Sequence, residues 1–177
     1  KIESIQETSF EYTNWLKSGI HFLNNLESLY SNGGVNEKHA IISYKIAQGY
    51  LSAVPERTVR VRIRDQQGFI TIKGIGNTTG TTRFEWEKEI PVNEAENLLL
   101  LCEPTIIEKI RHIVPANDKL FFEVDEFFGE NEGLLIAEIE LPHENTSFTK
   151  PSWLGEEVTG KLEYYNASLA IKPFSNW

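Results

Sequence analysis

Hydrophobic and charged residues alternate along five stretches of the chain between residues 58 and 141. In the first stretch Arg60, Arg62 and Arg64 alternate with valine and isoleucine. Successive side chains of a β-strand point to opposite faces of a sheet, so this pattern predicts a strand with one cationic face and one apolar face. The same alternation predicts four further strands, at 69–73, 84–90, 121–125 and 137–141.

The charged faces of these strands are sorted by sign. The second strand ends in Lys73, whereas the later strands carry the carboxylates of Glu85, Glu87 and Glu89, of Glu123 and Asp125, and of Glu138 and Glu140. The charged face of an ordinary sheet lies in water, but like charges two residues apart repel unless an opposite charge lies among them. A polyanion would suit the arginine strand and divalent cations would suit the carboxylate strands, so a bound metal–polyphosphate would suit both.

The remaining patterns predict helices and more strands. Helical spacing of apolar residues predicts a long helix over 8–31, which ends before Gly33. Strands are predicted within 41–51 and at 106–114, and a short helix capped by Asn93 is predicted at 94–102. The total is about eight strands, mostly antiparallel. Closing them into a barrel would remove the sheet edges and enclose a narrow lumen. The predicted fold is therefore α+β, an eight-stranded antiparallel β-barrel with a polar interior and flanking helices.

Composition limits the partners of the chain. The 177 residues are predicted to form one domain over 1–177, and a net charge of −9 argues against a general grip on nucleic acid. No stretch approaches the roughly 20 apolar residues of a membrane span and no signal peptide is evident, so a cytoplasmic protein without a membrane partner is expected. The single cysteine, Cys102, excludes a disulfide framework and is expected to be buried and inert. The chain has no methionine, so either residues before Lys1 or internal methionines are missing.

An ordered series of motifs from Tyr44 to the C-terminus resembles the CYTH domains, also called triphosphate tunnel metalloenzymes. Each motif is weak alone, but the whole series in this order is specific. It comprises Gln48-Gly49-Tyr50-Leu51, Val61-Arg62-Ile63-Arg64, Thr71-Ile72-Lys73-Gly74, Arg83-Phe84-Glu85-Trp86-Glu87, Glu108-Lys109-Ile110-Arg111, Phe122-Glu123-Val124-Asp125, Ala137-Glu138-Ile139-Glu140 and Gly155-Glu156-Glu157-Val158-Thr159. The resemblance implies an eight-stranded barrel that forms a tunnel, and hydrolysis of a triphosphate with Mg²⁺ or Mn²⁺.

The resemblance also implies roles for particular residues. Arg62, Arg64, Lys73 and Arg111 would hold phosphate oxygens with Lys109 beside them, Asp125, Glu138 and Glu140 would bind metal, and Glu85 and Glu87 would orient the attacking water or bind a second metal. The chemistry fits, because an arginine fork matches two phosphate oxygens and a hard divalent ion prefers carboxylate oxygens. The predicted function is hydrolysis of tripolyphosphate or a nucleoside triphosphate.

Two departures from the family pattern leave alternatives open. The family begins with a strand bearing Glu-x-Glu-x-Lys, of which only Ile2-Glu3 remains in a 1–40 segment that is atypical in its predicted helix. A family arginine near the C-terminus falls at Glu163, where Lys161 would be the substitute. The alternatives are a non-catalytic polyphosphate- or nucleotide-binding module and an adenylate cyclase of the same family. The helix over 8–31 is expected to pack on the barrel or on a second copy, which leaves a homodimer open.

Overall fold

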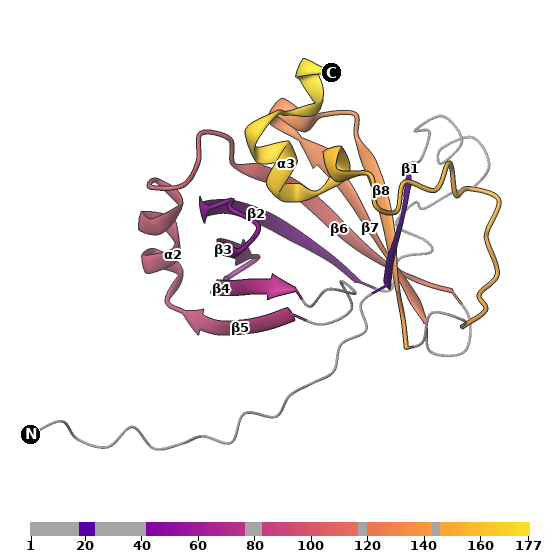
Figure 1. Ribbon diagram of the computed structural model, residues 1–177, viewed down its shortest axis with the longest axis horizontal. Coiled ribbons are helices and arrows are strands. Elements are labelled where there is room, and N and C mark those ends of the chain that lie inside the picture. Colours follow the sequence, from indigo (N-terminus) through magenta and orange to yellow (C-terminus); the bar gives the residue numbers. More distant parts are fainter. Residues whose placement is uncertain (1–17, 24–41, 77–82, 117–119, 143–145) are drawn as a thin grey trace, which may run out of the picture.

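The strands of this protein form one curled antiparallel sheet. A computed structural model describes residues 18–23 by their backbone, together with 42–76, 83–116, 120–142 and 146–177. The strands are β1 (Ser18–Leu23), β2 (Ile42–Ser52), β3 (Arg57–Arg64), β4 (Gln67–Gly76), β5 (Arg83–Ile90), β6 (Ile107–Pro115), β7 (Phe121–Phe128) and β8 (Leu135–Leu141). Their order is β1-β8-β7-β6-β2-β3-β4-β5, and every neighbouring pair is antiparallel (Figure 1). The antiparallel arrangement of the strands in the predicted barrel is confirmed.

The first strand corrects the prediction of a helix over 8–31. Residues Ser18–Leu23 pair with β8, in a register that runs from Ser18 opposite Leu141 to Leu23 opposite Ile136. Apolar residues at positions 20 and 22 fit a strand as well as a helix, and pairing satisfies the backbone groups along the open side of β8. The rest of 8–31, and the Ile2-Glu3 remnant, lie outside the described residues. No pairing between β1 and β5 occurs within the described ranges, so closure into a barrel stays a prediction.

Strand register places the charged residues on one face of the sheet. Gln48 of β2 lies opposite both Arg62 of β3 and Ile107 of β6, and Thr71 of β4 lies opposite both Arg60 of β3 and Glu87 of β5. Because alternate residues share a face, the same side includes Arg64, Lys73, Glu85, Lys109, Arg111, Glu123, Asp125, Glu138 and Glu140. We call this side the charged face.

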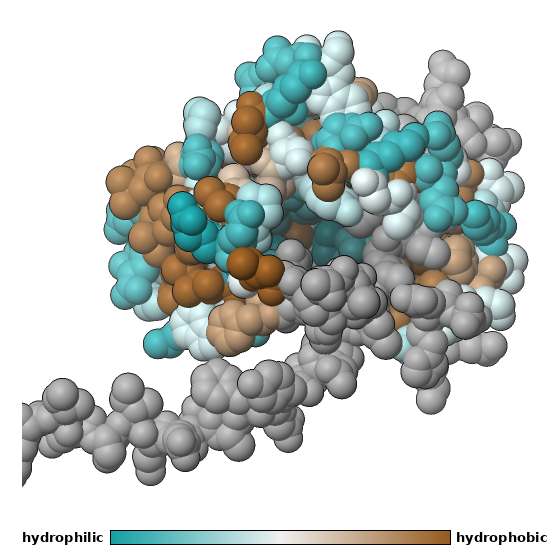
Figure 2. Space-filling view, in the orientation of Figure 1, coloured by the Kyte–Doolittle hydropathy of each residue, from teal (hydrophilic) through white to brown (hydrophobic). Residues whose placement is uncertain are grey.

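The opposite face of the sheet is apolar. Val114, Phe122, Val124, Ala137, Ile139 and Leu141 form a buried cluster there, covered by Phe148, Trp153 and Leu154 of the C-terminal segment. Over β2, β3 and β4 the cover is helix α2 (Val92–Leu99), whose Ala95 is fully buried. The predicted cap by Asn93 is wrong, because Pro91 precedes the helix and no side chain caps it. Figure 2 shows hydrophobic residues gathered over this part of the molecule, where Leu100 and Leu101 are exposed.

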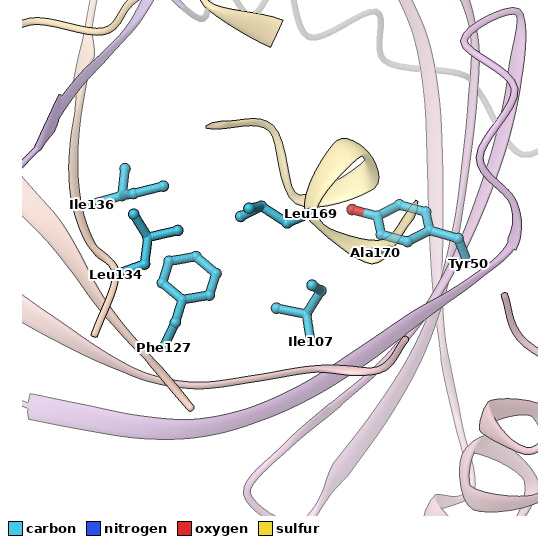
Figure 3. Close-up of a cluster of buried hydrophobic side chains, with 7 residues drawn as sticks. All are labelled: Tyr50, Ile107, Phe127, Leu134, Ile136, Leu169 and Ala170. Atoms are coloured by element: carbon cyan, nitrogen blue, oxygen red, sulfur yellow. The ribbon is translucent and has the colours of Figure 1, made fainter. Parts of the chain in front are cut away.

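A second apolar cluster lies on the same side of the sheet as the charged face. Its members are Tyr50, Ile107, Phe127, Leu134, Ile136, Leu169 and Ala170. Figure 3 shows the strand residues of this cluster around Leu169 and Ala170 of helix α3 (Asn166–Ile171). The last connections are 3₁₀ turns at Gly129–Asn131, Leu162–Tyr164 and Phe174–Asn176. Within the described residues, no helix is long and apolar enough to cross a membrane.

The contact beneath Gly49 leads to a stability prediction. A Cβ atom on Gly49 would lie 2.7 Å from the Cβ of Cys102 and 2.8 Å from Cδ1 of Ile106. Gly49→Ala should therefore lower the free energy of unfolding by about 1–3 kcal/mol through overpacking, as measured by urea denaturation. Gly74→Ala is the matched strand control, since its nearest contact would be an ordinary 3.4 Å to Phe84. Equal stability of the two variants would contradict the packing described here.

Candidate active site

Two arginines of β3 meet a glutamate from β5 on the charged face. Nη2 of Arg60 lies 3.3 Å from Oε2 of Glu87, and Nη2 of Arg62 lies 3.2 Å from the same oxygen. The alternation of β3 brings both guanidinium groups to this side, and the pairing of β4 with both β3 and β5 brings the carboxylate across. One carboxylate thus offsets part of the charge of two adjacent arginines.

Both arginines have a buried Nε donor that finds no acceptor in the described part of the chain. Nε of Arg60 and Nε of Arg62 have no hydrogen-bond partner among the described residues. Burial lowers the pKa of Arg62 to about 10, and the positive charge of Arg60 adds to this effect. Arg111 on β6 also lowers that pKa, so cations from separate strands lie within electrostatic reach of one another. Buried donors and crowded cations favour an anion on this side of the sheet.

Two further contacts order the β4 and β5 side of the site. The Thr71 hydroxyl donates a 2.7 Å hydrogen bond to Oε2 of Glu87, and Nζ of Lys73 lies 3.0 Å from Oε1 of Glu85. Burial raises the pKa of Glu87, but the hydrogen bond from Thr71 and the charges of Arg62 and Arg60 outweigh it, so this pKa lies below its ordinary value. Both predicted catalytic glutamates therefore lie beside cations.

Arg64 lies against aromatic rings. Its guanidinium carbon is 5.2 Å from the centre of the Tyr44 ring and 5.1 Å from that of Phe69, and its Nη2 donates to Gln67 at 3.1 Å. Phe69 also lies under Arg62, at 5.4 Å. Contacts of this kind hold the planar groups by one face and leave edge donors for a ligand.

Lys109, Arg111 and Asp125 form the most buried charged group of the site. Oδ2 of Asp125 accepts from Nζ of Lys109 at 2.6 Å and from Nη2 of Arg111 at 2.7 Å, and Oδ1 accepts from Nε of Arg111 at 2.7 Å. Burial alone would raise the pKa of Asp125, but these two cations lower it to about 2. Burial lowers the pKa of Lys109 to about 8 despite the attraction of Asp125, whereas for Arg111 that attraction outweighs burial and raises the pKa.

This buried group is linked to helix α3 by a hydrogen bond. Oδ1 of Asn166, the first residue of α3, accepts a hydrogen bond from Nζ of Lys109 at 3.1 Å. No local pattern in the sequence indicates this contact, because the two residues are 57 positions apart. Thr71 and Glu123 were also missed as site residues, although each shares strand parity with a predicted one.

Carboxylates from two strands gather on the other side of Arg111. Glu123 of β7 binds Nη1 of Arg111 and lies opposite Glu138 of β8 in register. Burial raises the pKa of Glu123, and the charges of Glu138, Asp125 and Glu140 raise it further, so these carboxylates lie within reach of one another. Such crowding favours a cation among them.

The donor set suits a hard divalent ion. Glu138 and Glu140 share a face of β8, and carboxylate oxygens are the ligands that Mg²⁺ and Mn²⁺ prefer. Both oxygens of Asp125 already accept from cations, so the metal role of Asp125 stays a prediction. In the described part of the chain, no three acidic, histidine or cysteine side chains are gathered closely enough to hold an ion. The residue types fit a metal, and the assignment of ligands is a proposal.

The structure brings the sequence-predicted residues into two groups on one face. Arg62, Arg64, Lys73, Glu85 and Glu87 lie on β3–β5, and Lys109, Arg111, Asp125, Glu138 and Glu140 lie on β6–β8. The suggested substitute Lys161 lies instead on the surface, 2.7 Å from Glu156, and Glu163 is exposed.

Comparison with known sequences identifies the family. The model of the CYTH domain matches residues 37–173. The chain belongs to the CYTH domain family. An inorganic triphosphatase of Acetivibrio thermocellus is 49% identical over 131 residues, which cover 73% of this chain and 82% of that protein. An inorganic triphosphatase of Nitrosomonas europaea is 35% identical over 139 residues, covering 76% and 87% of the two chains.

Solved structures agree with this assignment. The crystal structure of the inorganic triphosphatase NE1496 matches with a TM-score of 0.63 and 28% identity, covering 86% of this CYTH chain and 96% of that one. A conserved hypothetical protein from Pyrococcus furiosus, 18% identical, matches with a TM-score of 0.51 over 72% and 79% of the two chains and supports the fold alone.

The buried Asp125 predicts a pH dependence of stability. Its pKa in the folded protein, about 2, lies below the ordinary value of 3.8, so its contribution to stability is complete above about pH 5 and is lost as the pH falls towards 2. Asp125→Asn should lower the free energy of unfolding by about 3–5 kcal/mol at neutral pH, because it removes the counter-ion of Lys109 and one of the carboxylates that bind Arg111. Urea denaturation at a series of pH values should show a smaller acid-dependent loss in this variant than in the wild type.

Glu126 provides the control for this measurement. It lies on the opposite face of the same strand, 3.7 Å from His112. Glu126→Gln should leave both the neutral-pH stability and the acid slope close to those of the wild type, and an equally large loss there would contradict the assignment to Asp125.

Proposed function

We propose that this chain hydrolyses the terminal phosphoryl group of a triphosphate, with inorganic tripolyphosphate as the simplest substrate and Mg²⁺ or Mn²⁺ as cofactor. Two curated relatives, at 49% and 35% identity, are inorganic triphosphatases. In the structure, the observation that carries the proposal is the pair of half-buried arginines, Arg60 and Arg62, whose buried Nε atoms have no acceptor among the described residues. They lie on a face of the sheet that also bears crowded carboxylates. A bound triphosphate would accept hydrogen bonds from the arginines, and its counter-cations would offset the charge of the carboxylates.

The cations that would bind the phosphate chain lie in two groups on different strands. Arg62, Arg64 and Lys73 would bind it from β3 and β4, and Lys109 and Arg111 from β6. Guanidinium forks match two phosphate oxygens each, and the aromatic rings under Arg62 and Arg64 would fix their planes. Asp125 would hold Lys109 and Arg111 in place, because it contacts both with its two oxygens.

The carboxylates would serve metal and water. Glu138 and Glu140 would hold the ion, and a divalent ion supplies neutralisation of the charge on the phosphate oxygens. Glu85 and Glu87 would orient the attacking water, or a second ion that does so, from the opposite side of the site. Attack by water needs placement in line with the leaving oxygen and no protein nucleophile. This division of roles is the one that the family resemblance implies.

The finer architecture is part of the same proposal. We infer that the curled sheet closes into an eight-stranded tunnel with the charged face inside, and that α3 closes one end of it. The apolar cluster around Leu169 supports the closed end, because it lies on the charged face of β2, β6, β7 and β8. A cytoplasmic location and a small-molecule substrate belong to this proposal as well.

Phosphate release tests the proposed reaction and its metal. Tripolyphosphate and ATP are each incubated with the protein in Mg²⁺, in Mn²⁺ and in EDTA. We expect release from tripolyphosphate with metal and none in EDTA. Glu140→Gln should abolish metal-dependent release while circular dichroism shows an unchanged fold. Activity that survives EDTA would remove the metal from the proposal, and calorimetric binding of tripolyphosphate without release would favour a binding module.

Arg62 tests the phosphate contacts. Arg62→Ala should weaken tripolyphosphate binding about tenfold to hundredfold, because a hydrogen bond to a charged group contributes about 1.5–3 kcal/mol. Calorimetry with the protein in metal-free buffer measures this directly. Arg57→Ala is the matched control, since Arg57 is an exposed arginine of the same strand on the opposite face. Equal effects of the two substitutions would refute a specific role for Arg62.

A further inference from the structure

Thr71 lies between an arginine and a glutamate that the proposed mechanism uses. Thr71 itself has no role in that mechanism so far. It is fully buried in β4 and lies opposite Arg60 on one side and Glu87 on the other. Its hydroxyl donates to Oε2 of Glu87 at 2.7 Å and accepts from Nη2 of Arg60 at 3.1 Å. These directions are required by the chemistry, because a guanidinium can only donate and a carboxylate anion can only accept.

The bond from Thr71 differs in kind from the other contacts of Glu87. That carboxylate also accepts from Arg60 at 3.3 Å and from Arg62 at 3.2 Å and 3.5 Å. Both arginines would be attracted to a bound triphosphate, which carries more charge than one carboxylate and matches their forks. The neutral hydroxyl of Thr71 has no such competing attraction. The hydrogen bond from Thr71 is also the shortest of these contacts. Threonine is β-branched, so its side chain is stiff about χ1.

We propose that Thr71 is a positioning residue, which holds Glu87 in its catalytic orientation once the arginines have turned to the substrate. The inference rests on the proposed function and adds to it the contact that keeps Glu87 in place during turnover. Among the described residues, Glu87 accepts hydrogen bonds from Thr71, Arg60 and Arg62. In the substrate complex Thr71 is the partner that remains.

The test compares two substitutions of different chemistry. Thr71→Val keeps the shape and removes the hydroxyl, so we expect kcat for tripolyphosphate to fall about tenfold to hundredfold while KM changes less than about threefold. Thr71→Ser restores the hydroxyl and should return kcat to within about threefold of the wild type. Metal-free binding of tripolyphosphate, measured by calorimetry, should stay within about threefold in both variants, because the phosphate contacts are made by other residues.

A double-mutant cycle separates positioning from a general effect on the fold. If Thr71 acts through Glu87, then adding Thr71→Val to Glu87→Gln should lower kcat no further. Thr58→Val is the matched control, because the Thr58 hydroxyl donates instead to the backbone oxygen of Val54 at 3.1 Å. Its kcat should equal that of the wild type.

The outcomes divide clearly. Three results would each overturn the inference. The first is a wild-type kcat in Thr71→Val, and the second is a kcat in Thr71→Ser as low as that in Thr71→Val. The third is that Thr71→Val lowers kcat as much in the Glu87→Gln background as in the wild type. A wild-type protein that releases no phosphate from tripolyphosphate would instead refute the proposed function, before any variant is compared.

Discussion

Pairing of opposite charges between different strands of the sheet is the interaction on which this structure depends. Three arginines two residues apart on β3 would repel one another on the curled side of a sheet, where water is limited. Glu87 of β5 forms ion pairs with two of them, and Asp125 of β7 forms ion pairs with Lys109 and Arg111. Each acid therefore comes from a different strand than its cation. The site therefore forms only when the strands of the sheet come together.

The apolar residues leave this charged face free for a ligand. One cluster lies on the opposite face of β6–β8, under Phe148, Trp153 and Leu154, and α2 covers the opposite face of β2–β4. The other cluster lies at an end of the charged face, where α3 meets the strands. Hydrophobic burial is roughly proportional to area and non-directional, so it stabilises the sheet without fixing the polar groups. Their positions come from hydrogen bonds, among which the contact of Asn166 with Lys109 joins the closed end to the site.

Local patterns predicted the strands well because their period is simple. Alternation of Arg60, Arg62 and Arg64 with apolar residues is sufficient to orient β3, and the same reasoning orients β4, β5, β7 and β8. It failed at Ser18–Leu23, where apolar positions fit two periods and a partner strand decided between them. It also failed at the start of α2, where Pro91 took the place expected for a capping residue.

The sequence by itself determined which side chains share a face and which sign of charge each strand carries, because these follow from spacing along one chain. Only the tertiary structure decided which side chains form ion pairs and hydrogen bonds with one another. It made Asp125 the counter-ion of both Lys109 and Arg111, placed the hydroxyl of Thr71 between Arg60 and Glu87, and brought Asn166 to Lys109. These contacts join residues that are 11 to 57 positions apart. They depend on strand order and register, which no local pattern encodes.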